Sequence, residues 1–164
     1  MKTTKIVSLL LVTVLICGCK KENWSDWKAQ NEVWLAQNAL CDSIVTTPTG
    51  LQYKCIDAGW EYSAQPDEQK MVVITYTGQL INGYVFDSTF DKTTQKDNPA
   101  SMYVSEVVQG FAEGLKKMHQ YGHFKFYIPY KLGYGANGSG SEGTERFIPP
   151  YSTLIFDVTL HSVN

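Results

Sequence analysis

An Asn-Gly pair between two short apolar runs constrains this chain more than any other feature. The pair lies within residues 76–88, which read YTGQLINGYVFDS. Asn-Gly favours a tight hairpin turn in which both central residues take positive φ values. The segment is therefore predicted to be a strand, a turn at Asn82 and Gly83, and a short return strand. The return strand carries an aromatic residue, Phe86, next to a carboxylate, Asp87.

A second informative segment, residues 147–158, reads FIPPYSTLIFDV. Two consecutive prolines are incompatible with the interior of a sheet, so they predict a bend at the start of the last strand. Side chains alternate between the two faces of a strand, so Leu154, Phe156, Val158 and Leu160 share one face. This strand is therefore predicted to bury an apolar row.

Strands dominate the rest of residues 50–164. Alternating apolar residues predict strands at 51–57, 72–77 and 124–128. The polar residues 91–100 predict a long, irregular flap, and the glycine-rich residues 133–144 predict another loop.

One short helix is predicted near residues 110–118, because Phe111, Leu115 and Met118 recur at helical spacing. Gly110 and Gly114 would each weaken it by about 1 kcal/mol relative to alanine, and close approach of the helix to a sheet would offset this. The expected fold class is α+β: a twisted antiparallel sheet of about five strands wrapped around one short helix, with an N-terminal helical extension.

The two segments together closely resemble the FKBP-type peptidyl-prolyl cis-trans isomerases. The resemblance extends over roughly residues 50–163, and it implies that residues 50–164 form an isomerase domain of this α+β fold. It also implies a peptidyl-prolyl isomerase, acting on the X-Pro bonds of exported proteins during folding and needing neither cofactor nor metal.

An X-Pro bond isomerises over a barrier of about 18–20 kcal/mol because amide resonance is lost as the bond twists. The twisted amide is less polar than the planar one, so a dry apolar pocket favours the transition state. The resemblance assigns pocket walls to aromatic and aliphatic side chains, hydrogen-bond donors to the Val108 amide and the Tyr134 hydroxyl, and a rim carboxylate to Asp87. The full set of expected site residues is Tyr76, Phe86, Asp87, Val107, Val108, Phe111, Tyr134, Ile148 and Phe156.

Three positions differ from the family pattern. Phe111 stands where many members have a tryptophan floor, so a shallower pocket is expected. Ala100 stands at an aromatic wall position, which would open one side, and Phe147 replaces a common aliphatic residue. These differences leave two alternatives to an enzyme: a chaperone or protein-binding lipoprotein of the same fold with weak or no isomerase activity, and a structural envelope lipoprotein.

The N-terminus is predicted to be a targeting segment. Lys2 and Lys5 precede an apolar run at 6–16 that is too short to span a bilayer, which takes about 20 apolar residues. The run ends in Gly18 and Cys19, as in bacterial lipoprotein signals, so residues 1–18 are expected to be removed and Cys19 to be lipidated. The alternative is an ordinary secreted protein cut nearby.

The expected location is the bacterial envelope, with the protein held on a membrane by its lipid. Lys20, directly after the lipidated cysteine, favours the outer membrane. The whole chain carries a net charge of −2, and loss of Lys2 and Lys5 makes it more negative, which argues against nucleic acid as a partner.

Residues 19–49 are expected to form a tether and a helix. Ser25 is predicted to cap the helix, which would run to about Asp42. Two arrangements would cover its indoles: docking against the sheet of the same chain, or a homodimer contact. The apolar residues at roughly helical spacing are Trp24, Trp27, Val33, Trp34 and Leu40.

Two cysteines lie beyond the N-terminal segment, Cys41 and Cys55. An exported compartment permits a disulfide between them, and a loop of this length would contribute about 3 kcal/mol. The alternative is two separate buried thiols. His119 and His123 have the i, i+4 spacing of a metal pair, but Gly122 is expected to end the helix between them, so no metal site is predicted.

Overall fold

The computed structural model describes residues 23–164, so the predicted signal peptide and Cys19 lie outside the described residues. The main sheet has seven strands, and every strand pair in it is antiparallel. No helix among residues 23–164 has the length and apolar content needed to cross a membrane. The strands are β1 (Val45–Thr46), β2 (Gln52–Asp57), β3 (Met71–Gln79), β4 (Val85–Ser88), β7 (Ala100–Tyr103), β8 (His123–Ile128) and β9 (Leu154–Val163).

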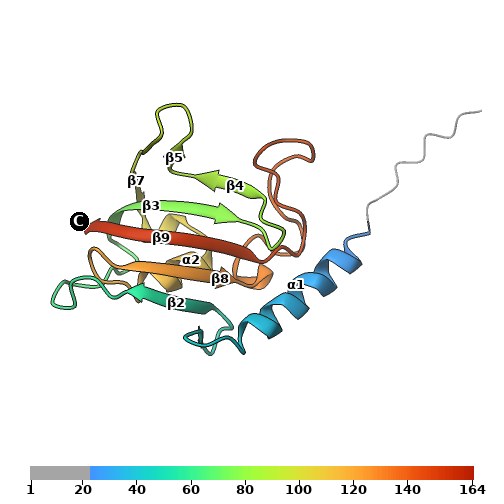
Figure 1. Cartoon of the computed structure of the whole chain (residues 1–164), viewed down its shortest axis with the longest axis horizontal. Coiled ribbons are helices and arrows are strands. Elements are labelled where there is room, and N and C mark those ends of the chain that lie inside the picture. Colours follow the sequence, from blue (N-terminus) through green and yellow to red (C-terminus); the bar gives the residue numbers. More distant parts are fainter. Residues whose placement is uncertain (1–22) are drawn as a thin grey trace, which may run out of the picture.

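The strand order is β1-β2-β8-β9-β3-β4, which places the two strands of the informative motifs, β3 and β9, side by side (Figure 1). Two strands pair with the side of β3 opposite β9: β7 pairs with residues 71–74, and β4 pairs with residues 77–79. The α+β prediction with an antiparallel sheet is confirmed.

The chain between β4 and β7 differs from the prediction of an irregular flap. It contains a small hairpin of β5 (Phe90–Asp91) and β6 (Lys96–Asp97). The turn is stabilised by the Asp91 carboxylate, which accepts the backbone N–H groups of Thr93 and Thr94. Such side-chain bonds allow a polar segment without apolar alternation to form a turn.

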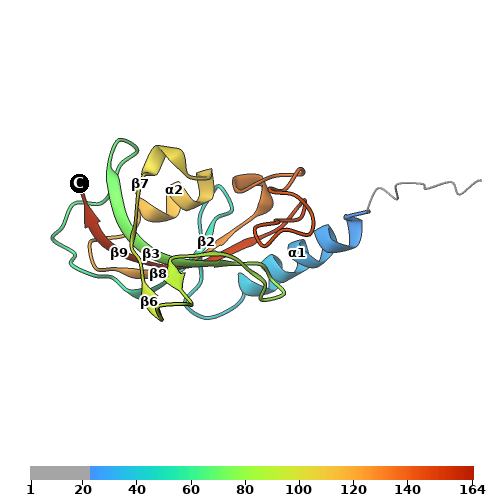
Figure 2. The same ribbon diagram turned by 90° about the horizontal axis from the view of Figure 1, so that it is seen from above.

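The domain helix, α2 (Gln109–Leu115), lies across one face of the sheet (Figure 2). A Cβ at Gly110 would come within 2.4 Å of Ile128, and one at Gly114 within 2.8 Å of the Phe126 ring. The predicted reason for both glycines, close approach of helix to sheet, is confirmed. The helix ends at Leu115, earlier than predicted. Met118 lies in the turn that follows the helix, and its side chain is buried.

The N-terminal helix, α1 (Ser25–Asn38), packs beside one end of the sheet (Figure 1). The prediction that Ser25 caps it is wrong: Trp24 is the N-cap, and the Ser25 hydroxyl bonds the neighbouring Asp26 carboxylate instead of a helix N–H group. The helix also ends before Asp42, and Leu40 lies beyond it, exposed to solvent.

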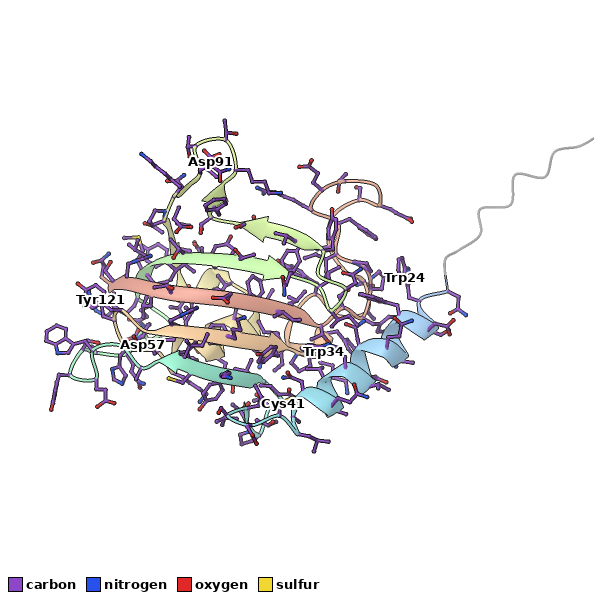
Figure 3. All side chains as sticks on the ribbon, viewed as in Figure 1. Trp24, Trp34, Cys41, Asp57, Asp91 and Tyr121 are labelled. Carbon is purple, nitrogen blue, oxygen red and sulfur yellow. The ribbon has the colours of Figure 1, made fainter. Side chains whose placement is uncertain are left out.

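The indoles of α1 contact the rest of the same chain, as one of the two predicted arrangements requires. The Trp24 ring lies 6.2 Å from that of Phe147, and the Trp34 ring 5.8 Å from that of Tyr127. Both tryptophans are labelled in Figure 3 along the side of α1 that faces the domain. Val33 is exposed, so it does not belong to this contact. A homodimer through this helix stays a prediction.

The predicted disulfide is wrong, since Cys41 and Cys55 are both free. Their alternative, burial as thiols, is also wrong because both are exposed. Cys41 lies in the turn after α1 and its sulfur points back to the carbonyl oxygen of Gln37, at 3.7 Å. Cys55 lies in the solvent-exposed end of β2, beyond the two residues of this strand that pair with β1.

Candidate active site

A cavity of about 430 Å³ opens between α2, the ends of β3, β4 and β9, and the loop that joins β8 to β9. All nine residues predicted for the site line it. Four more residues line it that the sequence analysis did not single out. The nine are Tyr76, Phe86, Asp87, Val107, Val108, Phe111, Tyr134, Ile148 and Phe156, and the four are Met102, Glu106, Ser139 and Arg146.

Three phenylalanine rings form the apolar base of the cavity. The Phe156 ring lies 4.7 Å from Phe111 and 5.5 Å from Phe86, both in edge-to-face arrangements. All three residues are buried. Edge-to-face pairs are favourable beyond the area they bury, so the three rings stabilise one another as well as forming an apolar surface.

Gly78 in β3 allows this arrangement. A Cβ at Gly78 would lie 2.7 Å from the Phe86 ring and 2.8 Å from the Phe156 ring. Carbon atoms in favourable contact lie about 3.5–4.0 Å apart. The absence of a side chain at this position therefore lets both rings lie close to the backbone of the strand.

The turn that brings Phe86 back beside β3 differs from the prediction. Only Gly83 has a positive φ, of 83°, and Asn82 does not. The N–H of Gly83 donates to the carbonyl of Leu80, and the N–H of Leu80 donates to the carbonyl of Tyr84. This is a three-residue loop closed by a left-handed glycine. Asn82 contributes its side-chain oxygen, which accepts the N–H of Tyr84.

The rim of the cavity carries a carboxylate, Asp87. It accepts the Tyr76 hydroxyl at 2.7 Å and the Ser88 N–H at 3.1 Å, and it lies 3.9 Å from the Arg146 guanidinium. Burial first, and then the bond to Asp87, raise the pKa of Tyr76 above its ordinary value. Tyr76 is therefore a neutral donor that fixes one Asp87 oxygen.

Two further donors face the cavity without a partner in the described chain. The amide N–H of Val108, directly before α2, makes no hydrogen bond within residues 23–164. The Tyr134 hydroxyl likewise has no partner there, and burial raises the pKa of this side chain. Both groups are available to carbonyl oxygens of a bound peptide.

Two predictions about the cavity walls are wrong. Ala100 does not line the cavity; Met102, two residues further along β7, does. Phe147 also lies outside it, in a separate hollow with Leu80, Tyr84 and Pro149. Its neighbour Ile148 forms the wall instead, because adjacent residues in an extended segment point to opposite sides.

The residues that the sequence analysis missed lie where local patterns are weak. Ser139 and Arg146 belong to the loop that joins β8 to β9, and Ser139 pairs with Ile148 through two backbone hydrogen bonds. No periodicity identifies such a position. Met102 was detectable, because it alternates with its neighbours along β7.

No group of three or more metal-ligating side chains occurs among residues 23–164. The two histidines considered for a metal pair are separate: His119 bonds the carbonyl of Ser63, and His123 bonds Asp157. The helix that would have carried both ends at Leu115, before either histidine.

Comparisons with known proteins agree with the geometry. Residues 62–161 match the model of the family "FKBP-type peptidyl-prolyl cis-trans isomerase". "Outer membrane protein MIP" of Legionella longbeachae is 39% identical, over 83% of this chain and 54% of that protein. "FKBP-type peptidyl-prolyl cis-trans isomerase FkpA" of Aeromonas hydrophila is 36% identical, over 82% of this chain and 46% of that protein.

A crystal structure of FkpA from Escherichia coli superposes with a TM-score of 0.75 at 34% identity, covering 85% of this chain and 60% of that one. The chain spans about half the length of these curated relatives. The matched region contains every residue that lines the cavity. The chain therefore belongs to the FKBP-type peptidyl-prolyl cis-trans isomerase family.

Proposed function

We propose that this protein is a peptidyl-prolyl cis-trans isomerase that acts on X-Pro bonds of exported polypeptides as they fold. The observation that carries the proposal is the set of nine pocket residues around one apolar cavity. Its volume of about 430 Å³ lies within the usual range for ligand pockets, about 300–1,000 Å³. Membership of the isomerase family supports the same reaction.

In the proposed mechanism the three phenylalanine rings receive the proline ring and exclude water from the amide. Twisting the bond localises the nitrogen lone pair and reduces the polarity of the amide, so the dry base stabilises the twisted state over the planar one. No bond to the protein forms, and no proton is transferred. The reaction needs a shaped pocket and a few donors.

The two unpartnered donors have distinct roles in this proposal. The Val108 N–H binds the carbonyl on the far side of the proline, and the Tyr134 hydroxyl binds a carbonyl of the peptide across the cavity. Asp87, fixed by Tyr76, is assigned the role of facing the partial positive charge on the carbonyl carbon of the twisted amide. These groups hold the peptide while the apolar walls act on the bond.

Kinetics on short X-Pro peptides test the proposal. The wild-type protein should raise the rate constant of cis-to-trans conversion in proportion to enzyme concentration. Folded protein that binds proline-containing chains but leaves this rate at the uncatalysed value would contradict it and favour the chaperone reading. Refolding of a protein limited by proline isomerisation, measured in parallel, distinguishes catalysis from holding.

Substrate preference for a bulky apolar residue before proline belongs to the same proposal. Among Val107, Phe147 and Ala100, the residues that the sequence offers for an apolar subsite, only Val107 lines the cavity. Met102 and Val108 supply the apolar surface instead, and Glu106 repels acidic side chains. Leu-Pro peptides should have the higher kcat/KM, and equal values for Leu-Pro and Glu-Pro would contradict this.

We also propose that Cys19 carries a lipid that holds the protein on a membrane of the cell envelope. The apolar run before Gly18 and Cys19 supports this, and a relative is named as an outer membrane protein. Each buried methylene contributes about 0.8 kcal/mol, so several acyl chains anchor firmly. Cys19→Ser should leave the domain folded but move it to the soluble fraction. A variant that still sediments with membranes would contradict the anchor.

A further inference from the structure

The loop between β8 and β9 carries a large part of the cavity wall. Tyr134, Ser139, Arg146 and Ile148 all belong to it, and all line the cavity. The loop returns to the sheet through residues 149–153, which connect Ile148 to β9. The placement of the wall therefore depends on how residues 149–153 are held.

Helix α1 holds residues 149–153 in place through a chain of hydrogen bonds. The indole N–H of Trp27 donates to the Ser152 hydroxyl oxygen at 3.0 Å. The Ser152 hydroxyl in turn donates to the carbonyl oxygen of Pro149 at 2.7 Å. The indole is therefore linked, through one hydroxyl group, to the backbone of Pro149, the residue that directly follows the wall residue Ile148.

A second link runs through Asn31, which is 1% exposed. Its side-chain oxygen accepts the N–H of Thr153 at 2.7 Å, and its amide nitrogen donates to the carbonyl of Trp27 at 2.8 Å. The nitrogen and the oxygen of this buried side-chain amide are both hydrogen-bonded, and loss of either bond would leave a buried polar atom without a partner. The two bonds therefore fix the orientation of the Asn31 side chain. A helix that only tethered the domain would not need this contact.

The backbone between the two links is held in an unfavourable conformation. Tyr151 has a φ of 62°, which is rare for a residue with a bulky side chain. Its N–H donates to the carbonyl of Gly135, and the Lys28 ammonium lies 5.3 Å from the centre of its ring. Such strained residues persist only where their surroundings determine the conformation, and α1 supplies part of these surroundings.

The start of α1 makes a third contact with the loop. The Trp24 ring lies beside Phe147, next in sequence to Ile148. Figure 3 shows Trp24 against this loop, while Trp34 lies further along α1 near the end of β8. The half of α1 that carries Trp24, Trp27 and Asn31 thus contacts the loop, and the half that carries Trp34 contacts the sheet.

We propose that α1 is a positioning element of the active pocket, with Trp27 and Asn31 as positioning residues that fix the wall carried by the β8–β9 loop. The proposal rests on the isomerase function proposed above for its kinetic consequence. The links predict that loosening α1 at Trp27 moves Ile148 and Arg146 and weakens catalysis without unfolding the sheet.

The test compares Trp27→Phe with Trp34→Phe in the full-length chain. Trp27→Phe keeps an aromatic ring but removes the N–H that reaches Ser152. Trp34→Phe makes the same chemical change on the same helix, beside Tyr127 and away from the loop. Because one ordinary hydrogen bond corresponds to about a 2- to 10-fold effect, Trp27→Phe should lower kcat/KM within this range. Trp34→Phe should change it by less than about twofold.

Native-state amide hydrogen exchange supplies the readout that does not depend on activity. In Trp27→Phe, exchange at residues 146–153 should accelerate relative to wild type, while exchange in β8 and β9 stays unchanged. Trp34→Phe should leave residues 146–153 protected. Equal effects of both variants on activity and exchange, or none from Trp27→Phe, would overturn the proposal.

Ser152→Ala gives a second route that leaves α1 intact and serves if Trp27→Phe folds poorly. It removes the same link from the loop side, together with the bond from Ser152 to Pro149, so the double variant should lose no more activity than Ser152→Ala alone. Fully additive losses would overturn the proposal. Absence of isomerase activity in the wild type would instead refute the proposed function, and hydrogen exchange would still decide whether α1 holds the loop.

Discussion

Gly78→Ala tests whether the positions of the two wall rings matter for catalysis. The added methyl group would lie 2.7 Å from the Phe86 ring and 2.8 Å from the Phe156 ring. Both rings would have to move by about 1 Å to restore ordinary contact distances. Gly78 does not have a positive φ, so the backbone itself accepts alanine.

The expected effects on stability and activity differ in size. Overpacking a core costs about 1–3 kcal/mol, which lowers the melting temperature of a domain of this size by roughly 4–12 °C. Misplacement of a catalytic surface by about 1 Å reduces rates by up to about 100-fold. We therefore expect Gly78→Ala to fold and to lose about 10- to 100-fold in kcat/KM.

Gly114→Ala is the matched control. Its methyl group would lie 2.8 Å from the Phe126 ring, a similar clash, but Phe126 does not line the cavity. Alanine also favours a helix over glycine by about 1 kcal/mol, which offsets part of the clash. Thermal unfolding followed by circular dichroism should show that Gly114→Ala is folded. Peptide kinetics should give it an activity within about threefold of wild type. A folded Gly78→Ala variant with wild-type activity would refute the reasoning about the rings.

Three further outcomes are expected. Because the pKa of Tyr76 is raised in the folded state, its contribution to stability is complete below about pH 10 and is lost as the pH rises above that value. Tyr76→Phe should therefore reduce the fall in melting temperature above pH 10, and an unchanged fall would contradict this. Arg146→Ala should change kcat/KM by less than about twofold, because the Arg146 side chain is 83% exposed and its guanidinium lies 3.9 Å from Asp87; a tenfold loss would contradict a minor role. Cys41 and Cys55 should both react with a thiol reagent in the native protein. Cys55 should react more slowly than a free cysteine, because burial, and then Asp57, raise its pKa. Cysteines that react only after treatment with a reductant would indicate a disulfide.

Features that depend on local pattern were predictable from the sequence. The alternation in β3, β8 and β9 follows directly from burial of one face, and Gly110 and Gly114 mark the closest approach of α2 to the sheet. The motifs around Phe86 and Phe156 placed both rings in one cavity, because the strands that carry them, β4 and β9, both pair with β3 in a fixed register.

Features that depend on the path of loops were not predictable. Phe147 and Ile148 are adjacent and both apolar, and only the pairing of Ser139 with Ile148 decides which of them faces the cavity. Arg146 reaches Asp87 from a loop without periodicity. In the sequence, Asn31 resembles an ordinary polar residue on a helix surface. It is buried in the structure, where its side-chain oxygen accepts the backbone N–H of Thr153.

The central claim is that dry apolar walls carry most of the catalysis. A neutral hydrogen bond contributes about 0.5–1.5 kcal/mol, so Tyr134→Phe should slow turnover by about tenfold at most. Leucine keeps much of the apolar volume that alanine would lose, so Phe86→Leu and Phe156→Leu should both remain folded.

The most direct test is kcat/KM for cis-to-trans conversion of a Leu-Pro peptide, measured for these three variants and the wild type under conditions where all are folded. Phe86→Leu and Phe156→Leu should each lose more activity than Tyr134→Phe. The opposite ranking in folded proteins would contradict it and would assign the catalysis to directed hydrogen bonding by Tyr134.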